Sequence, residues 1–163
     1  MFLLALDCST KSTGWCIYDD KKLTKYGCIT SSSTDKIKRI YKMIEGLREI
    51  LSENKIDKIV LEEVRPDGGS PQTYKALMYL QAAIAFFIHD EYSNIEIEFI
   101  YPSSWRACCG IKNGRGIKRE ELKKADIEFV KNKYNITVND DIADAIGIGY
   151  SQTFKKEDKG YAW

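Results

Sequence analysis

Acidic side chains follow two short apolar runs of the sequence and gather again near its end. Asp7 closes the run FLLALD, Glu62 closes the run KIVLE, and Asp141 and Asp144 lie in DDIADAIGIG. Residues three apart share one face of a helix, so the last two acids could bind one ion together. Converging carboxylates repel by about 4 kcal/mol per pair at about 4 Å and an effective dielectric near 20, so they need a cation or protons. Oxygen ligands without His or Cys favour magnesium or manganese over zinc.

Each of these acids also has a simpler interpretation when taken alone. An acid at the end of a strand is usually a solvated turn residue, and acids at the start of a helix usually cap it or complement its dipole. Residue chemistry also leaves two neighbouring pairs unresolved, because Glu63 follows Glu62 and Asp140 precedes Asp141. The metal-binding hypothesis therefore depends on all the acids converging.

Basic residues are concentrated between residues 106 and 133, where the segment GIKNGRGIKR also carries three glycines. Glycines allow backbone amides to approach phosphates closely, here beside Lys112 and Arg115. Such a basic footprint indicates a nucleic-acid partner. For the lysines from 123 to 133, a solvated helix face is an equally good interpretation.

Composition sets the broad class of protein. The 163 residues fit one domain, and 25 basic against 24 acidic residues give a net charge of +1, which neither demands nor excludes a polyanion. The five cysteines include an adjacent pair and lack C-x-x-C spacing, so we expect reduced thiols rather than disulfides or a zinc site. No apolar run approaches membrane-spanning length, and the first residues do not resemble a signal peptide. We expect a soluble, cytoplasmic protein.

Hydrophobic periodicity predicts an α/β domain with a mixed sheet. Aromatic and β-branched runs predict two strands that pair as a hairpin after the first strand, and long amphipathic segments predict helices. The predicted strands cover residues 2–6, 13–18, 23–30, 58–62 and 95–101, and the predicted helices cover residues 35–54, 72–91, 116–134 and 140–153. Residues 1–154 form the predicted domain, and residues 155–163 form a charged tail.

Three motifs in this order resemble a known family. LALDCSTKSTGW, VLEEV and DIADAIGIG are similar to the acidic motifs of the RuvC Holliday junction resolvases, most closely those of the bacteriophage branch. The resemblance extends over essentially the whole chain. It implies an RNase H-like fold, with a mixed five-stranded sheet of three antiparallel and then two parallel strands, flanked by helices.

The resemblance also implies a site and a reaction. Asp7 would bind two Mg²⁺ ions, or Mn²⁺ in their place, with Glu62 completing one site and Asp141 and Asp144 the other. The motif selects Glu62 over Glu63 and Asp141 over Asp140. The implied enzyme is an endodeoxyribonuclease that hydrolyses phosphodiesters in branched DNA, foremost four-way junctions and also flaps and three-way junctions, leaving 5′ phosphates.

DNA contacts are expected from the basic residues near these motifs. The expected set is Arg65, Arg106, Lys112, Arg115, Lys118 and Arg119. Of these, Arg106 and Lys118 fall where the resembled family has basic residues near its active site. The chain departs from the family pattern in having D-C-S where bacterial members usually have D-P-G, and Arg65 where they have an aromatic residue. Both departures leave the breadth of branched substrates open.

A homodimer is expected from the symmetry of the substrate and from the apolar surface of one helix. A four-way junction has near two-fold symmetry, which a homodimer would match, and the helix over 72–91 has more apolar surface than one sheet-facing stripe needs. Burial within the monomer is the alternative reason for that surface.

The pattern D-x-S-T-x-x-T-G starting at Asp7 also resembles the phosphate-binding turn of actin-like ATPases, although the chain is too short for their second lobe. A non-catalytic junction-binding module is the third hypothesis.

Overall fold

A mixed five-stranded sheet lies at the centre of the computed structural model, which describes residues 1–66, 70–114 and 116–154. The strand order is β3-β2-β1-β4-β5. β1 pairs antiparallel with β2 and β2 antiparallel with β3, whereas β1 with β4 and β4 with β5 are parallel. The strands are β1 (Phe2–Asp7), β2 (Ser12–Asp19), β3 (Lys22–Thr30), β4 (Lys58–Glu62) and β5 (Glu96–Ile100).

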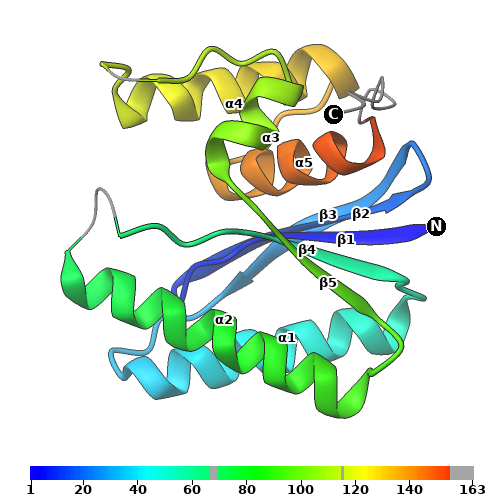
Figure 1. Ribbon diagram of the computed structural model, residues 1–163, viewed down its shortest axis with the longest axis vertical. Helices are drawn as coiled ribbons and strands as arrows, with labels where there is room; N and C mark the ends of the chain where they lie inside the picture. Colours follow the sequence, from blue (N-terminus) through cyan, green and yellow to red (C-terminus); the bar gives the residue numbers. More distant parts are fainter. Residues whose placement is uncertain (67–69, 115, 155–163) are drawn as a thin grey trace, which may run out of the picture.

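Helices cover both faces of this sheet. Figure 1 shows α1 and α2 on one face and α3, α4 and α5 on the other. The helices are α1 (Lys36–Glu53), α2 (Pro71–Glu91), α3 (Pro102–Cys108), α4 (Arg119–Tyr134) and α5 (Asp140–Thr153). This is the predicted α/β architecture, and it confirms the expected three antiparallel and two parallel strands.

Strand alternation separates two hydrophobic cores. Leu4 and Leu6 of β1 pack with α1 and α2, whereas Leu3 and Ala5 pack with α5 and Trp105 of α3. Successive side chains of a strand point to opposite faces, so apolar residues at consecutive positions are needed where both faces are covered. This explains the continuous apolar run before Asp7.

Local signals set the ends of the helices. Asp35 is the N-cap of α1 and accepts hydrogen bonds from the Ile37 and Lys38 amides. Ser70 caps α2, whose first residue is Pro71. The predicted helix from 116 starts only at Arg119 in the structure.

Two differences from the predicted elements have physical causes. Gly116 has φ of +90°, which is incompatible with a helical turn and delays the start of α4. The short helix α3 was missed because its seven residues are too few to show a helical period, although Pro102 at its first position is a start signal. All five cysteines are free thiols, as expected.

Small residues let α5 lie very close to the sheet and to α3. A Cβ atom on Gly147 would come within 2.5 Å of the Trp105 ring, and one on Gly14 of β2 within 1.9 Å of the Asp141 carbonyl oxygen. Both distances are far below van der Waals contact, so larger side chains would push α5 away. The predicted tail at residues 155–163 lies outside the described residues. Within the described ranges, no helix is long and apolar enough to cross a membrane.

Candidate active site

Parallel pairing brings the first two acids together at one edge of the sheet. Leu6 of β1 is in register with Leu61 of β4, so the residues that follow them, Asp7 and Glu62, end neighbouring strands side by side. Val60, two residues before Glu62, packs in the core beneath α5. Strand alternation therefore directs Glu62 to the α5 face of the sheet. This is a structural reason, independent of family resemblance, for selecting Glu62 over Glu63.

The first turn of α5 brings the remaining acids to the same edge. Asn139 caps the helix by accepting a hydrogen bond from the Ile142 amide. Ser12, the first residue of β2, donates its hydroxyl to Asp141 Oδ2. Lys123 of α4 forms an ion pair with Asp140. Asp140 and Asp141 thus have different partners, one from a helix and one from the sheet.

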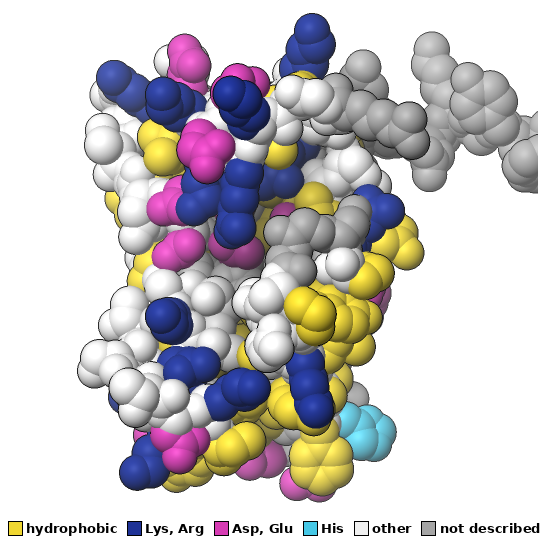
Figure 2. Space-filling view, turned by 90° about the vertical axis from the view of Figure 1, so that its left-hand side faces the viewer, with side chains coloured by type: hydrophobic (Ala, Val, Ile, Leu, Met, Phe, Trp, Pro, Cys, Tyr) yellow, Lys and Arg dark blue, Asp and Glu magenta, His cyan; other side chains and the backbone are white. Residues whose placement is uncertain are grey.

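All four predicted acids line one cleft with a volume of about 780 Å³. Figure 2 views the molecule from the side where this cleft opens and shows acidic and basic side chains next to each other in its upper half. The lining of the cleft thus combines acidic with basic side chains. Its charged lining consists of Asp7, Glu62, Glu63, Arg65, Arg106, Arg119, Lys123, Asp140, Asp141 and Asp144.

Glu62 is held from both faces of the sheet. The indole nitrogen of Trp105 donates to Glu62 Oε2 at 2.7 Å, and the side-chain amide of Gln81 donates to the Glu62 carbonyl oxygen at 2.6 Å. Trp105 is completely buried and Gln81 nearly so. α3 therefore fixes the carboxylate while α2 fixes its backbone.

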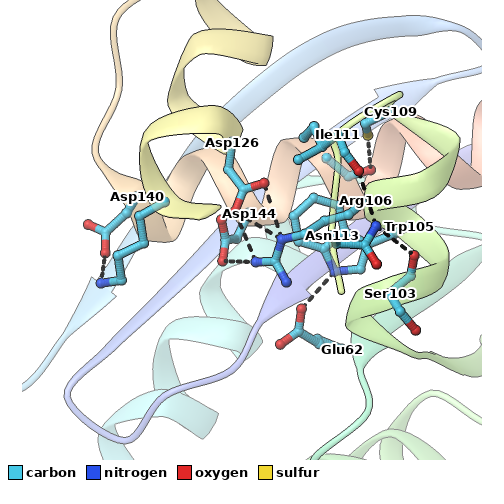
Figure 3. Close-up of polar contacts among 12 residues, drawn as sticks. Glu62, Ser103, Trp105, Arg106, Cys109, Ile111, Asn113, Asp126, Asp140 and Asp144 are labelled. Atoms are coloured by element: carbon cyan, nitrogen blue, oxygen red, sulfur yellow. Dashed lines mark hydrogen bonds and ion pairs between the residues drawn. The ribbon is translucent and has the colours of Figure 1, made fainter. Parts of the chain in front are cut away.

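Arg106 lies next to Trp105 in sequence and bridges two other acids. Its guanidinium donates to both oxygens of Asp126 of α4 and to Asp144 Oδ2 at 3.2 Å (Figure 3). Asp126 is 0% exposed, Arg106 11% and Asp144 15%. Arg106 was predicted to contact phosphate, and in the structure it pairs with carboxylates, so its phosphate role stays a prediction.

Burial and mutual repulsion raise the proton affinity of the cleft. Burial raises the pKa of Asp7 well above its usual range, and the charges of Glu62 and Asp141 raise it further. The pKa of Asp144 is raised by burial, by Asp7 and by Asp126. Burial also raises the pKa of Glu62, against the hydrogen bond from Trp105. Such an acidic cluster favours either bound protons or a cation.

The donor set fits a divalent cation, although the carboxylates are not gathered around one point. Hard oxygen donors line the cleft, and Asp144 Oδ1 is buried with no hydrogen-bond donor among the described residues. A buried oxygen of this kind needs a positive partner. Within the same residues, no three acidic, histidine or cysteine side chains are grouped closely enough to hold an ion. Arg106 is the cation that contacts Asp144 in this arrangement.

The other predicted DNA contacts are distributed unequally. Arg65 lies over the ring of Tyr101 at the cleft, and Arg119 also lines it. Lys112 and Lys118 are exposed but do not line it. Arg115 lies outside the described residues. The neighbouring glycines 110, 114 and 116 all have positive φ, as a loop with unusual turns requires.

Sequence reasoning missed Trp105 and Asp126 as site residues. Asp126 gave a usable signal, because it lies four residues before the buried Val130 and thus on the apolar face of α4. An acid on such a face needs a buried positive partner. Trp105 gave no signal beyond being a tryptophan close to a basic residue.

Several solved structures have the same overall fold as this chain. Thermus thermophilus RuvC in complex with a Holliday junction substrate superposes with a TM-score of 0.71 at 11% identity, covering 93% of this chain and 92% of that one. This chain has the fold of the RuvC resolvases. The fowlpox virus Holliday junction resolvase matches with a TM-score of 0.63 at 18% identity, over 94% and 98% of the two chains.

A eukaryotic resolvase extends the likeness to RuvC-type folds. The yeast mitochondrial Holliday junction resolvase Ydc2 matches with a TM-score of 0.60 at 13% identity, covering 93% of this chain and 77% of that one. No protein-family model and no curated protein matches the sequence. The likeness to RuvC therefore lies in the fold, and function must be argued from the cleft.

Proposed function

We propose that this chain is a metal-dependent, structure-selective endonuclease that cleaves branched DNA, foremost four-way junctions. The observation that carries the proposal is the convergence of Asp7, Glu62, Asp141 and Asp144 on one cleft of a RuvC-type fold. The likeness supports the choice of substrate, because similar folds have been solved with Holliday junction DNA. The product ends would carry 5′ phosphates.

The chain's own residues would divide the work between holding cations and holding DNA. Asp7 and Glu62 would hold one Mg²⁺, and Asp7 with Asp141 and Asp144 a second, with Mn²⁺ as a substitute. When bound, the ions would activate the attacking water and stabilise the leaving 3′ oxygen. Ser12 would orient Asp141, and Trp105 would orient Glu62, so that fewer side-chain rotations are needed when the site fills.

The basic residues would bind the DNA backbone around this acidic base. Arg65 and Arg119 line the cleft, and Lys112 and Lys118 are exposed close to Arg119 in sequence. Cations beside the acids would offset the repulsion between the cleft and phosphates. Arg65 and the exposed ring of Tyr101 would offer a flat surface to an unpaired base at the branch point, in place of the family's aromatic residue.

A homodimer would place two such clefts on opposed strands of a junction. The apolar residues Leu80, Ile84 and Phe87 of α2 cannot form the dimer contact, because they are buried within the monomer. The outer face of α2 instead exposes Met78, Tyr79 and Phe86. Hydrophobic side chains gather on the lower right of the face shown in Figure 2. An exposed apolar face of this kind is typical of a protein contact.

The decisive experiment offers the purified protein labelled four-way, three-way, flap and duplex DNA, with Mg²⁺ or with EDTA. We expect incision of the branched substrates with Mg²⁺ alone, and none by the Asp7→Asn variant, which should still bind the junction. Full activity of that variant, or activity that survives EDTA, would overturn the metal assignment. A protein that retains ATP and cuts no DNA would instead favour the actin-like hypothesis.

A further inference from the structure

The Arg106 guanidinium is divided unequally between two carboxylates. Its Nε lies 3.2 and 3.1 Å from the two oxygens of Asp126, and one terminal nitrogen donates to Asp126 Oδ2 at 2.9 Å. The same terminal nitrogen reaches only one oxygen of Asp144, at 3.2 Å. Arg106 is therefore held mainly by Asp126 and contacts Asp144 through a single N–H group.

Arg106 contacts only one of the two carboxylate oxygens of Asp144 and leaves Oδ1 without a donor among the described residues. Guanidinium groups prefer to pair with a carboxylate through two parallel N–H bonds. Asp144 Oδ1, which receives no donor among the described residues, is the oxygen that a second bond from Arg106 would use. The competing contacts to Asp126 keep Arg106 from closing on Asp144 in this way.

Asp126 is well placed to act on Arg106, although it does not itself line the cleft. Its side chain is completely buried and projects from α4, whereas the cleft is lined by Arg106 and Asp144. Figure 3 shows Asp126 on the far side of Arg106 from Glu62. A group in this position can influence a bound cation through Arg106, which it holds, and through Asp144, whose pKa it raises.

We infer that Asp126 is a positioning residue that retains Arg106 on the α4 side, so that Asp144 stays available to a divalent cation. The inference rests on the proposed function in taking a cation as the ligand of the cleft. Without the Asp126 charge, Arg106 would pair with Asp144 through both oxygens and compete with the cation. Partners behind a metal ligand commonly change metal affinity by about 10- to 100-fold.

Mn²⁺ affinity, measured by electron paramagnetic resonance on folded protein, tests this directly. Asp126→Asn should weaken Mn²⁺ binding about tenfold. Arg106→Gln should bind at least as tightly as the wild type. The double variant Asp126→Asn with Arg106→Gln should bind no more weakly than Arg106→Gln alone, because the weakening caused by Asp126→Asn passes through Arg106.

A merely structural role for Asp126 predicts a different pattern. The ion pair would then only tie α4 to α3, and Asp126→Asn would lower the unfolding temperature without changing the Mn²⁺ affinity of the folded protein. An unchanged affinity would overturn the inference. So would a further loss of affinity when Asp126→Asn is added to Arg106→Gln, and this comparison decides the matter even if Asp126→Asn alone does not fold.

The outcomes for the inference and for the proposed function separate cleanly. A wild type that binds Mn²⁺ and shows the expected pattern, yet cuts no branched DNA, would overturn the proposed function and support the inference. A wild type that cuts DNA while Asp126→Asn keeps its Mn²⁺ affinity would overturn the inference alone. A wild type that binds no Mn²⁺ would overturn both.

Discussion

The Trp105 indole donates a 2.7 Å hydrogen bond to Glu62 Oε2, so a buried aromatic side chain orients one of the acids that line the cleft. Trp105→Phe keeps most of the ring packing but removes the donor. Removing a side chain that orients a metal ligand commonly lowers metal affinity or activity by about 10- to 100-fold. We therefore expect kcat to fall by about 10-fold or more. Steady-state kinetics on a four-way junction, with circular dichroism as the folding control, would measure it.

The same variant should change the pH profile. The Trp105 bond lowers the pKa of Glu62 against the raising effect of burial, so its loss raises that pKa further. Glu62 must be ionised to bind a cation. As the pH is lowered, Trp105→Phe should therefore lose activity at a higher pH than the wild type does. An acid limb that does not move would show that Glu62 does not set it.

The buried acids should make the metal-free protein less stable as pH rises. The pKa values of Asp7 and Asp144 are raised in the folded state, so the folded protein binds more protons than the unfolded chain above the ordinary carboxyl pKa of about 4. Stability therefore falls as pH rises from about 4 through the raised values. Thermal unfolding in EDTA across this window should show the fall, and excess Mg²⁺ should reduce it. A fall that is unaffected by Asp7→Asn would place its origin elsewhere.

Neutralising the basic residues at the start of α4 should weaken DNA binding without regard to sequence. Lys118→Gln with Arg119→Gln removes two exposed cations. Each lost phosphate contact should reduce the salt slope of binding by about 0.9 on duplex arms. Fluorescence anisotropy at several salt concentrations would measure the slope. Lys55→Gln, which removes one cation, is the control, because this exposed lysine precedes β4 and so lies at the end of the strands opposite the cleft. Equal slopes in both variants would place the DNA elsewhere.

A charge on the outer face of α2 should dissociate the proposed dimer. Phe86 is 71% exposed in the monomer, so Phe86→Glu should leave the fold intact while placing a charge in the interface. Analytical ultracentrifugation should report a lower mass than for the wild type. Tyr26→Glu, at an exposed aromatic residue of the edge strand β3, is the matched control and should remain dimeric. A wild type that sediments as a monomer, both alone and with a junction, would contradict the model.

Local sequence patterns could predict most of the fold. Within the site, they could predict the acids that lie at the ends of strands. The segments before Asp7 and Glu62 consist of consecutive apolar residues because helices cover both faces of the sheet. These apolar runs can be recognised in the sequence. The partners of the acids could not be predicted in this way. Ser12 meets Asp141, and Arg106 meets Asp126, only after α5 and α4 pack, and no local rule encodes such distant contacts.

The helix that lies against β2, α5, is the last element of the described chain to be synthesised. A growing chain that has reached only residue 139 already contains the sheet and Glu62, but it lacks Asp141 and Asp144. It also leaves the face that α5 covers, including Ala5 and Val60, open to solvent. A shortened product of this kind would therefore lack two of the four proposed cation ligands and would be prone to aggregate. The proposed cation site is therefore complete only after α5, the last helix of the described chain, has been synthesised.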